Sequence, residues 1–177
     1  PFDLTTSSAP ETLHWLLYGT SQAPITTGGG LSWTFDIFPG IMWSDDTELT
    51  ARCADALAGH LATLGITASY APVADLQHLP SNPIVRTRSF GADPKANATQ
   101  VQAAVRGIQG AGVTAALKHF PGHGHTTGDS HDDLPVVTQS RAKWQAEDRP
   151  PFAAGITAGA GVVMSGHLDI EGLDKGV

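Results

Sequence analysis

The chain has 177 residues, of which 41% are hydrophobic, and 17 acidic against 10 basic residues give it a formal net charge of −7. Such a chain can bury one sizeable core, so residues 1–177 are predicted to form a single globular domain or part of one. The basic residues form no stripe, which argues against a nucleic acid partner. No apolar run approaches the roughly 20 residues of a transmembrane segment, and the single cysteine, Cys53, excludes a disulfide within the chain.

Two elements are predicted at the start of the chain. A short strand is expected at residues 22–27, with the sequence QAPITT, and a helix at residues 44–65. Asp45 suits the N-cap of this helix, because Glu48 follows three residues later, and Gly65 suits its end. The apolar residues that share one helix face, and that we expect to be buried, are Leu49, Cys53, Leu57, Leu61 and Leu64.

A buried strand is predicted next at residues 66–75, with Asp75 at its end, and a polar loop that contains prolines follows it to residue 92. Asp93 and Pro94 then suit the cap and the first turn of a second helix. The glycines on either side of Ala111 stop this helix. Its predicted buried stripe consists of Val101, Val105 and Ile108.

The second half of the chain predicts two further strands, at residues 113–120 and 161–168. Between them Ser140 opens a helical stretch, which Pro150 and Pro151 interrupt and which then resumes. Strands and helices therefore alternate, as expected for right-handed β-α-β crossovers in a parallel sheet. A closed eight-stranded barrel needs about 250 residues, so the sheet is either open or part of a larger one. The lack of a capping element after the last strand favours the second interpretation.

Polar residues interrupt these strands at their C-terminal ends. They are Asp75, Lys118 with His119, and Ser165 with His167. Parallel α/β folds place their active sites at this edge of the sheet. Lys118 and His119 are unusual residues for a buried strand unless they face a pocket that uses them. The sequence therefore predicts a functional site at the carboxyl edge.

Residues 118–135, KHFPGHGHTTGDSHDDLP, form a segment that we call the histidine loop. Its residue types fit a metal site, a pair in which Asp129 orients His131 for proton transfer, or a solvated loop. No candidate ligand pair has helical i, i+4 spacing, which weakens the first interpretation, and the position at a strand end weakens the third. The candidate metal ligands are His123, His125, His131, Asp129, Asp132 and Asp133.

The histidine loop also carries a family resemblance. Residues 118–131 match the pattern K-H-F-P-G-H-G, four unspecified residues, then D-S-H. This pattern resembles the signature of glycoside hydrolase family 3, in its β-N-acetylglucosaminidase branch. Further segments resemble family segments in family order, and the resemblance extends over about residues 24–174. These segments are residues 71–75, 82–94, 140–152 and 162–174.

The resemblance implies a (β/α)8 TIM-barrel catalytic domain, of which residues 1–177 would hold about four β-α units. It implies a retaining exo-β-N-acetylglucosaminidase that acts on peptidoglycan- or chitin-derived glycosides. Carried over by position, His131 is the general acid/base and Asp129 is its orienting partner. The resemblance implies no metal ion and no other cofactor.

It also implies a set of substrate-binding residues for a small carbohydrate that contains N-acetylglucosamine. Arg88 matches the family arginine that contacts sugar hydroxyls, and its alternative role is an ion pair with Asp93. Lys118 and His119 match the adjacent pair that hydrogen-bonds the sugar. Asp75 and His167 are further candidates at strand ends, where they could instead hold loops in place.

Other residues of the region receive weaker assignments. Gly122, Gly124 and Gly128 would give the histidine loop the backbone freedom to close over a substrate. His125 falls at a variable position of the pattern and is expected to be solvated, and His78 carries no signal.

Two departures from the family pattern stand out. Thr26 and Thr34 align with the aspartate and arginine that grip the sugar in the family, and losing two charge-assisted hydrogen bonds would weaken binding. No acidic residue falls on the position of the nucleophilic aspartate. We therefore expect the nucleophile beyond residue 177, and we expect residues 1–177 alone to be inactive.

Three alternative functions remain at this point. They are a phosphorylase of the same family, a metal-dependent hydrolase that uses the histidine loop, and a degenerate sugar-binding protein, which the two threonines favour. A phosphorylase is reasonable because a neutral histidine repels an incoming phosphate less than a carboxylate does. The low lysine content and the start at Pro1 favour export over a cytoplasmic location.

Overall fold

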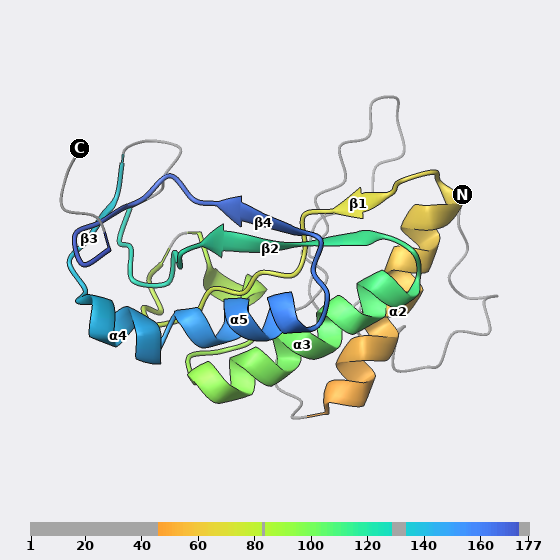
Figure 1. Ribbon diagram of the computed structural model, residues 1–177, viewed down its shortest axis with the longest axis horizontal. Coiled ribbons are helices and arrows are strands. Elements are labelled where there is room, and N and C mark those ends of the chain that lie inside the picture. Colours follow the sequence, from red (N-terminus) through yellow and green to blue (C-terminus); the bar gives the residue numbers. More distant parts are fainter. Residues whose placement is uncertain (1–45, 83, 129–133, 174–177) are drawn as a thin grey trace.

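The computed structural model describes residues 46–82, 84–128 and 134–173 (Figure 1). The strand predicted at residues 22–27 and the residues Asp45, Thr26 and Thr34 lie outside this part of the chain. The helices are α2 (Thr47–Thr63), the 3-10 helix η1 (Arg86–Arg88), α3 (Pro94–Gly110), α4 (Arg141–Ala146) and α5 (Arg149–Thr157). The strands are β1 (Ala68–Ser69), β2 (Thr114–Phe120), β3 (Val136–Val137), β4 (Val162–Ser165) and β5 (Asp169–Ile170).

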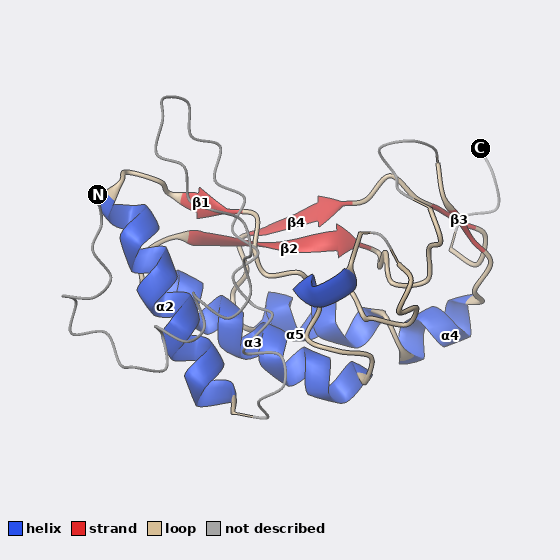
Figure 2. Cartoon of the chain, turned by 180° about the vertical axis from the view of Figure 1, so that it is seen from behind, coloured by secondary structure: helices blue, strands red, loops and turns tan. Residues whose placement is uncertain are grey.

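Strands β1, β2 and β4 form a parallel sheet in that order, with β2 in the middle. Figures 1 and 2 show α2, α3 and α5 along the same side of this sheet. The predicted alternation of parallel strands and helices is therefore confirmed. Strands β3 and β5 form a second, two-stranded parallel pair, which the sequence analysis did not predict. Among the helices that the structure describes, none combines the length and the apolar character needed to cross a membrane.

The strand predicted at residues 66–75 is only half buried. Its first half is exposed, with Tyr70 at 67%, and β1 covers two residues of it. Pro72 has no N–H to donate to a strand ladder, and the chain beyond it meets β2 through a single bridge between Val73 and Lys118. This bridge brings the buried Asp75 to the carboxyl end of the sheet.

Helix α2 forms where predicted, but its cap differs from the prediction, and of its predicted buried residues only Cys53 is fully buried. Asp46, not Asp45, is the N-cap, because its Oδ1 accepts hydrogen bonds from the N–H groups at positions 48 and 49. Leu64 is 76% exposed. The helix packs closely on α3, where a Cβ at Gly107 would lie 2.2 Å from the Ala51 carbonyl oxygen. Such close contact favours small residues, and the buried set is Thr50, Cys53, Ala54 and Ala58.

Helix α3 confirms the prediction made from its cap and its stripe. Asp93 accepts a hydrogen bond from the N–H of Ala96 at 2.7 Å. Val101, Val105 and Ile108 are buried in the core, together with Phe152 from α5. The helix ends at Gly110, within the predicted glycine pair. These apolar side chains pack against β2.

The helical stretch after Ser140 divides into α4 and α5, but its break lies before the prolines. Ser140 caps α4 as predicted, by accepting from the N–H of Lys143. The break consists of Glu147 and Asp148, and the two prolines occupy the first turn of α5. Proline is tolerated there because the first N–H groups of a helix have no intrahelical partner. The break turns two acidic side chains toward the histidine loop.

Candidate functional site

Asp75 is the centre of a hydrogen-bond network at the carboxyl edge of the sheet. It is fully buried, and its Oδ2 lies 2.7 Å from Nδ1 of His119. Its carboxylate also accepts from the backbone N–H of His119 at 3.1 Å and from that of His123 at 2.8 Å. Hydrogen bonds to an ionised acceptor are the stronger ones in proteins. Asp75 therefore holds the end of β2 and the start of the histidine loop in a fixed relation.

The same carboxylate fixes the orientation of the His119 ring. Because an ionised carboxylate only accepts hydrogen bonds, Nδ1 of His119 carries a proton, and Nε2 is the nitrogen left for another partner. The side chain of His119 is 17% exposed, and the ring of His123 meets it edge-on at 5.7 Å between centroids. The sequence placed Asp75 and His119 at the ends of two strands, and the structure brings them into contact.

Asn82 joins the histidine loop to the segment that precedes η1. It is fully buried, and its Nδ2 donates to the carbonyls of His123 at 2.8 Å and Thr126 at 3.0 Å. Its Oδ1 accepts from the N–H groups of Ile84 at 2.9 Å and Val85 at 2.8 Å. Both ends of the amide are thus used. The sequence analysis missed this residue, although an asparagine that precedes a proline is a turn signal.

The first two glycines of the histidine loop lie in close packing. A Cβ at Gly124 would be 2.0 Å from the backbone oxygen of Leu76, and one at Gly122, where φ is +134°, would be 3.0 Å from Cβ of Asp148. Both positions therefore need glycine for close approach. Gly128 differs from them, because no described atom lies within 4 Å of a Cβ built there.

The other predicted site residues that the structure describes are Arg88, Lys118 and His167. The Arg88 guanidinium donates to the carbonyl of Ile84, so its hydrogen bonds go to its own turn and not to Asp93. Lys118 is half-buried beside His119 on β2, and His167 is exposed two residues after β4. Asp129 and His131 lie outside the described residues. Asp75 therefore contacts His119 directly, and the acid/base pair of Asp129 and His131 remains a prediction.

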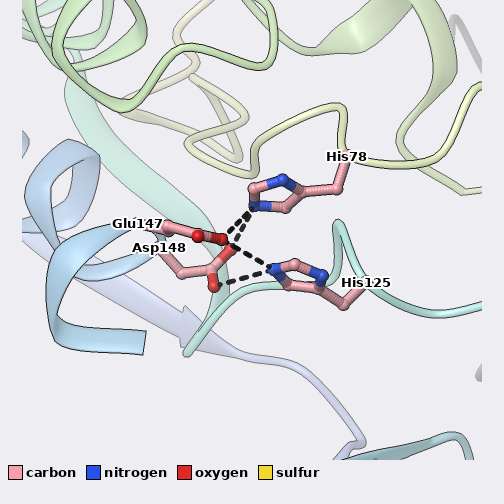
Figure 3. A group of neighbouring side chains, drawn as sticks. All are labelled: His78, His125, Glu147 and Asp148. Atoms are coloured by element: carbon pink, nitrogen blue, oxygen red, sulfur yellow. Dashed lines mark ion pairs between the residues drawn. The ribbon is translucent and has the colours of Figure 1, made fainter. Parts of the chain in front are cut away.

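A second polar group, the four-residue cluster, consists of His78, His125, Glu147 and Asp148 (Figure 3). Nε2 of His78 is 3.4 Å from Oδ1 of Asp148 and 3.7 Å from Oε2 of Glu147. Nε2 of His125 is 3.3 Å from Oδ2 of Asp148 and 3.5 Å from the same glutamate oxygen. The two imidazole rings stack at 3.7 Å between centroids.

Asp148 is the buried member of the four-residue cluster. It occupies the N-cap position of α5, but its side chain makes no capping hydrogen bond and turns to the histidines. Burial by itself raises the pKa of this carboxyl, but the nearby His125 and His78 outweigh burial and lower the pKa to about 2. Asp148 is therefore ionised at neutral pH.

This grouping differs from the sequence interpretation of the histidine loop. His125, which we expected to be solvated, belongs to the cluster, and so does His78, which carried no signal. His123 does not join them, because it is fully buried and its Nδ1 lies 2.5 Å from Oγ1 of Thr126. The other candidate metal ligands of the loop lie outside the described residues. A contact between positions as far apart in sequence as 78 and 148 leaves no local signal.

Comparisons with known proteins agree with the resemblance found in the sequence. The model for "Glycosyl hydrolase family 3 N terminal domain" matches residues 34–176. A beta-hexosaminidase A of Pseudoalteromonas piscicida is 36% identical over 159 residues, which are 89% of this chain and 27% of that protein. A family 3 β-N-acetylglucosaminidase from Paenibacillus sp. str. FPU-7 superposes with a TM-score of 0.73 and 37% identity, over 75% of this chain and 25% of that one.

A beta-glucoside phosphorylase, BglX, superposes with the same TM-score of 0.73 and with 29% identity, over 76% of this chain and 24% of that one. The chain thus spans about a quarter of the length of these relatives. The matches confirm the predicted TIM-barrel type of fold, of which the described strands and helices form a part.

Proposed function

We propose that this chain, which belongs to glycosyl hydrolase family 3, supplies the acid/base loop and part of the sugar-binding edge of a retaining exo-β-N-acetylglucosaminidase. The observation that carries the proposal is the network of Asp75, His119 and His123 at the carboxyl ends of parallel strands. This is the edge at which barrel enzymes bind their substrates. The names of the hexosaminidase and N-acetylglucosaminidase relatives support the substrate class.

The geometry suggests how the edge would bind a sugar. With Nδ1 of His119 protonated toward Asp75, its Nε2 can accept a hydrogen bond from a sugar hydroxyl. The Lys118 ammonium, on the neighbouring residue, can donate to a second hydroxyl, and Arg88 and His167 are proposed as further contacts. Asp75 acts through His119, as a positioning residue, because its own oxygens are already engaged.

The reaction needs a proton to move twice. In the first step a nucleophilic aspartate forms a bond to the anomeric carbon, the glycosidic bond breaks, and His131 donates its proton to the leaving oxygen. In the second step His131 takes a proton from water, which attacks the anomeric carbon and releases the aspartate. We propose that Asp129 orients His131 in both steps. None of residues 1–177 is assigned the role of nucleophile.

The test uses the complete protein and an unactivated N-acetylglucosaminide. We expect N-acetylglucosamine to be released with retained β configuration, as followed by NMR of the fresh product. His131→Ala should lower kcat at least about 100-fold, whereas His60→Ala, a change on the exposed face of α2, should leave it unchanged. Inverted product, or a His131→Ala variant with full turnover, would contradict the proposal.

Phosphorolysis is the second candidate, and the superposition on BglX favours it. The two reactions share the glycosyl-enzyme intermediate and differ only in whether water or phosphate attacks it. Adding inorganic phosphate to the same assay separates them. Formation of N-acetylglucosamine 1-phosphate at the expense of free sugar would identify a phosphorylase, and an unchanged product would identify a hydrolase.

A further inference from the structure

Four buried polar atoms of the four-residue cluster lack a hydrogen-bond partner. Both Nε2 atoms and both oxygens of Asp148 are buried, and none of the four has a hydrogen-bond partner of acceptable geometry. Asp148 is only 1% exposed. Buried polar groups are normally paired, and leaving one unpaired costs about 1–3 kcal/mol. Four such atoms that point at one spot (Figure 3) indicate a missing common partner.

The spacing of these atoms fits a metal ion. The four nitrogen–oxygen separations lie between 3.3 and 3.7 Å, and one ligand atom from each residue lies within 4.8 Å of the others. Zinc bonds of about 2.0–2.1 Å to nitrogen and oxygen in a tetrahedron place neighbouring ligand atoms about 3.3–3.4 Å apart. Because the two separations to Asp148 involve its two different oxygens, these distances fix three of the six edges of a tetrahedron with one oxygen from each carboxylate. Those three edges, at 3.3 to 3.7 Å, are close to the edges of a zinc coordination tetrahedron.

The charges and the ligand types of the cluster also favour a metal ion. The carboxylates of Glu147 and Asp148 bring negative charge to the site, and the Lys143 ammonium, 3.9 Å from Oε2 of Glu147, offsets it only in part. A divalent ion would supply further positive charge at this point, with both imidazoles as neutral ligands. A set of two imidazoles and two carboxylates suits zinc or a similar transition metal better than calcium or magnesium, which prefer oxygen ligands alone.

We propose that His78, His125, Glu147 and Asp148 bind one divalent transition-metal ion, zinc being the best match. The ligands come from three segments: the loop after Asp75, the histidine loop, and the break between α4 and α5. The ion would tie these segments together four residues before Asp129. Its role is structural, and it takes no part in the glycosidic chemistry. Glu147 is 33% exposed, so it marks the side from which an ion enters.

The first measurement is zinc binding by the complete protein after treatment with a chelator. We expect one equivalent of zinc per chain in a calorimetric titration. The double variant H78A/H125A removes two ligands and should weaken the affinity more than about 100-fold, since changes outside the ligand shell already cost 10- to 100-fold. His60→Ala is the matched control, because it removes a histidine from α2 and should bind zinc like the unaltered protein.

The double variant keeps His131 and its neighbouring aspartates, so it also separates the proposed site from zinc bound elsewhere on the histidine loop. Equal zinc binding by the double variant and the unaltered protein would overturn the proposal. So would the absence of any bound equivalent in the unaltered protein, which would leave the cluster as an ion-pair network only.

A second measurement does not depend on how well a variant folds. The unaltered protein loaded with Co²⁺ should show the intense visible d–d absorption of a tetrahedral site, and zinc should displace it at one equivalent. Only the weak spectrum of hydrated Co²⁺ would count against the site. Neither measurement uses glycosidase activity, so the metal site and the proposed function can fail separately.

Discussion

Two regions of this molecule are held together by different forces. Under the sheet, the buried side chains are apolar, and at its carboxyl edge many of them are polar. The apolar set includes Val101, Val105, Ile108, Val113, Leu117 and Phe152. The polar set includes Asp75, Asn82, Ser89, Asn97, His123, Thr126 and Asp148.

The difference shows how one small domain combines stability with a defined site. Burial of apolar surface is favourable in almost any orientation, so the core can adjust to small changes. A buried hydrogen-bond network stabilises only one arrangement, because each displaced donor or acceptor is left unpaired. Changes in the core should therefore lower stability alone, and changes at the edge should lower both stability and sugar binding.

The largest effect is expected for Asp75→Asn in the complete protein. The Asp75 carboxylate accepts from three N–H groups, and each hydrogen bond to a charged acceptor is worth about 1.5–3 kcal/mol of folding free energy. Because His119 would no longer be held by a carboxylate, kcat/KM should fall about 10- to 100-fold, the equivalent of one charge-assisted hydrogen bond. Urea unfolding and steady-state kinetics measure the two quantities. A variant that loses stability but keeps kcat/KM would show that the network only supports the fold.

Ile108→Ala tests the core side of the comparison. Its side chain is almost fully buried on α3, so truncation should lower the free energy of unfolding by about 2–5 kcal/mol. KM for the sugar should stay unchanged where the variant is folded. Ile156→Ala is the control, because that side chain on α5 is 54% exposed and its loss should change stability by less than about 0.5 kcal/mol. A raised KM for Ile108→Ala would mean that the two regions are coupled.

The smallest effect is expected from a pair of glycine variants in the histidine loop. Gly124→Ala forces a Cβ against the Leu76 backbone oxygen, which cannot move aside cheaply, and should cost about 1–3 kcal/mol. Gly128→Ala meets no described atom within 4 Å and should be near neutral. Thermal unfolding of both variants checks the difference. Equal midpoints would mean that the loop does not pack as described.

Local signals in the sequence were enough for part of the fold. Helix α3 was predicted correctly because Asp93, Pro94 and a valine stripe act within a few residues of one another. The buried face of α2 was predicted only in part, because Cys53 is buried as expected, but the close contact with Gly107 of α3 favours alanines over the predicted leucines. Sequence spacing describes which residues share a face, but the partner helix decides which face is buried.

The candidate site could likewise be predicted only in part from local sequence signals. Asp75, Lys118 and His119 were singled out because polar residues end apolar strands, and the structure brings Asp75 and His119 into contact there. Asn82 and the four-residue cluster could not be found in this way. Their partners are brought near by the tertiary fold, and a lone histidine such as His78 looks the same in sequence whether it is solvated or a ligand.

The most direct test of the sugar-binding edge is a crystal structure of the complete protein with a non-hydrolysable N-acetylglucosamine analogue. We expect sugar hydroxyls within about 3.2 Å of Nε2 of His119 and Nζ of Lys118, with the Asp75–His119 hydrogen bond intact. A sugar bound away from these two residues would contradict the assignment of the carboxyl edge as the substrate site.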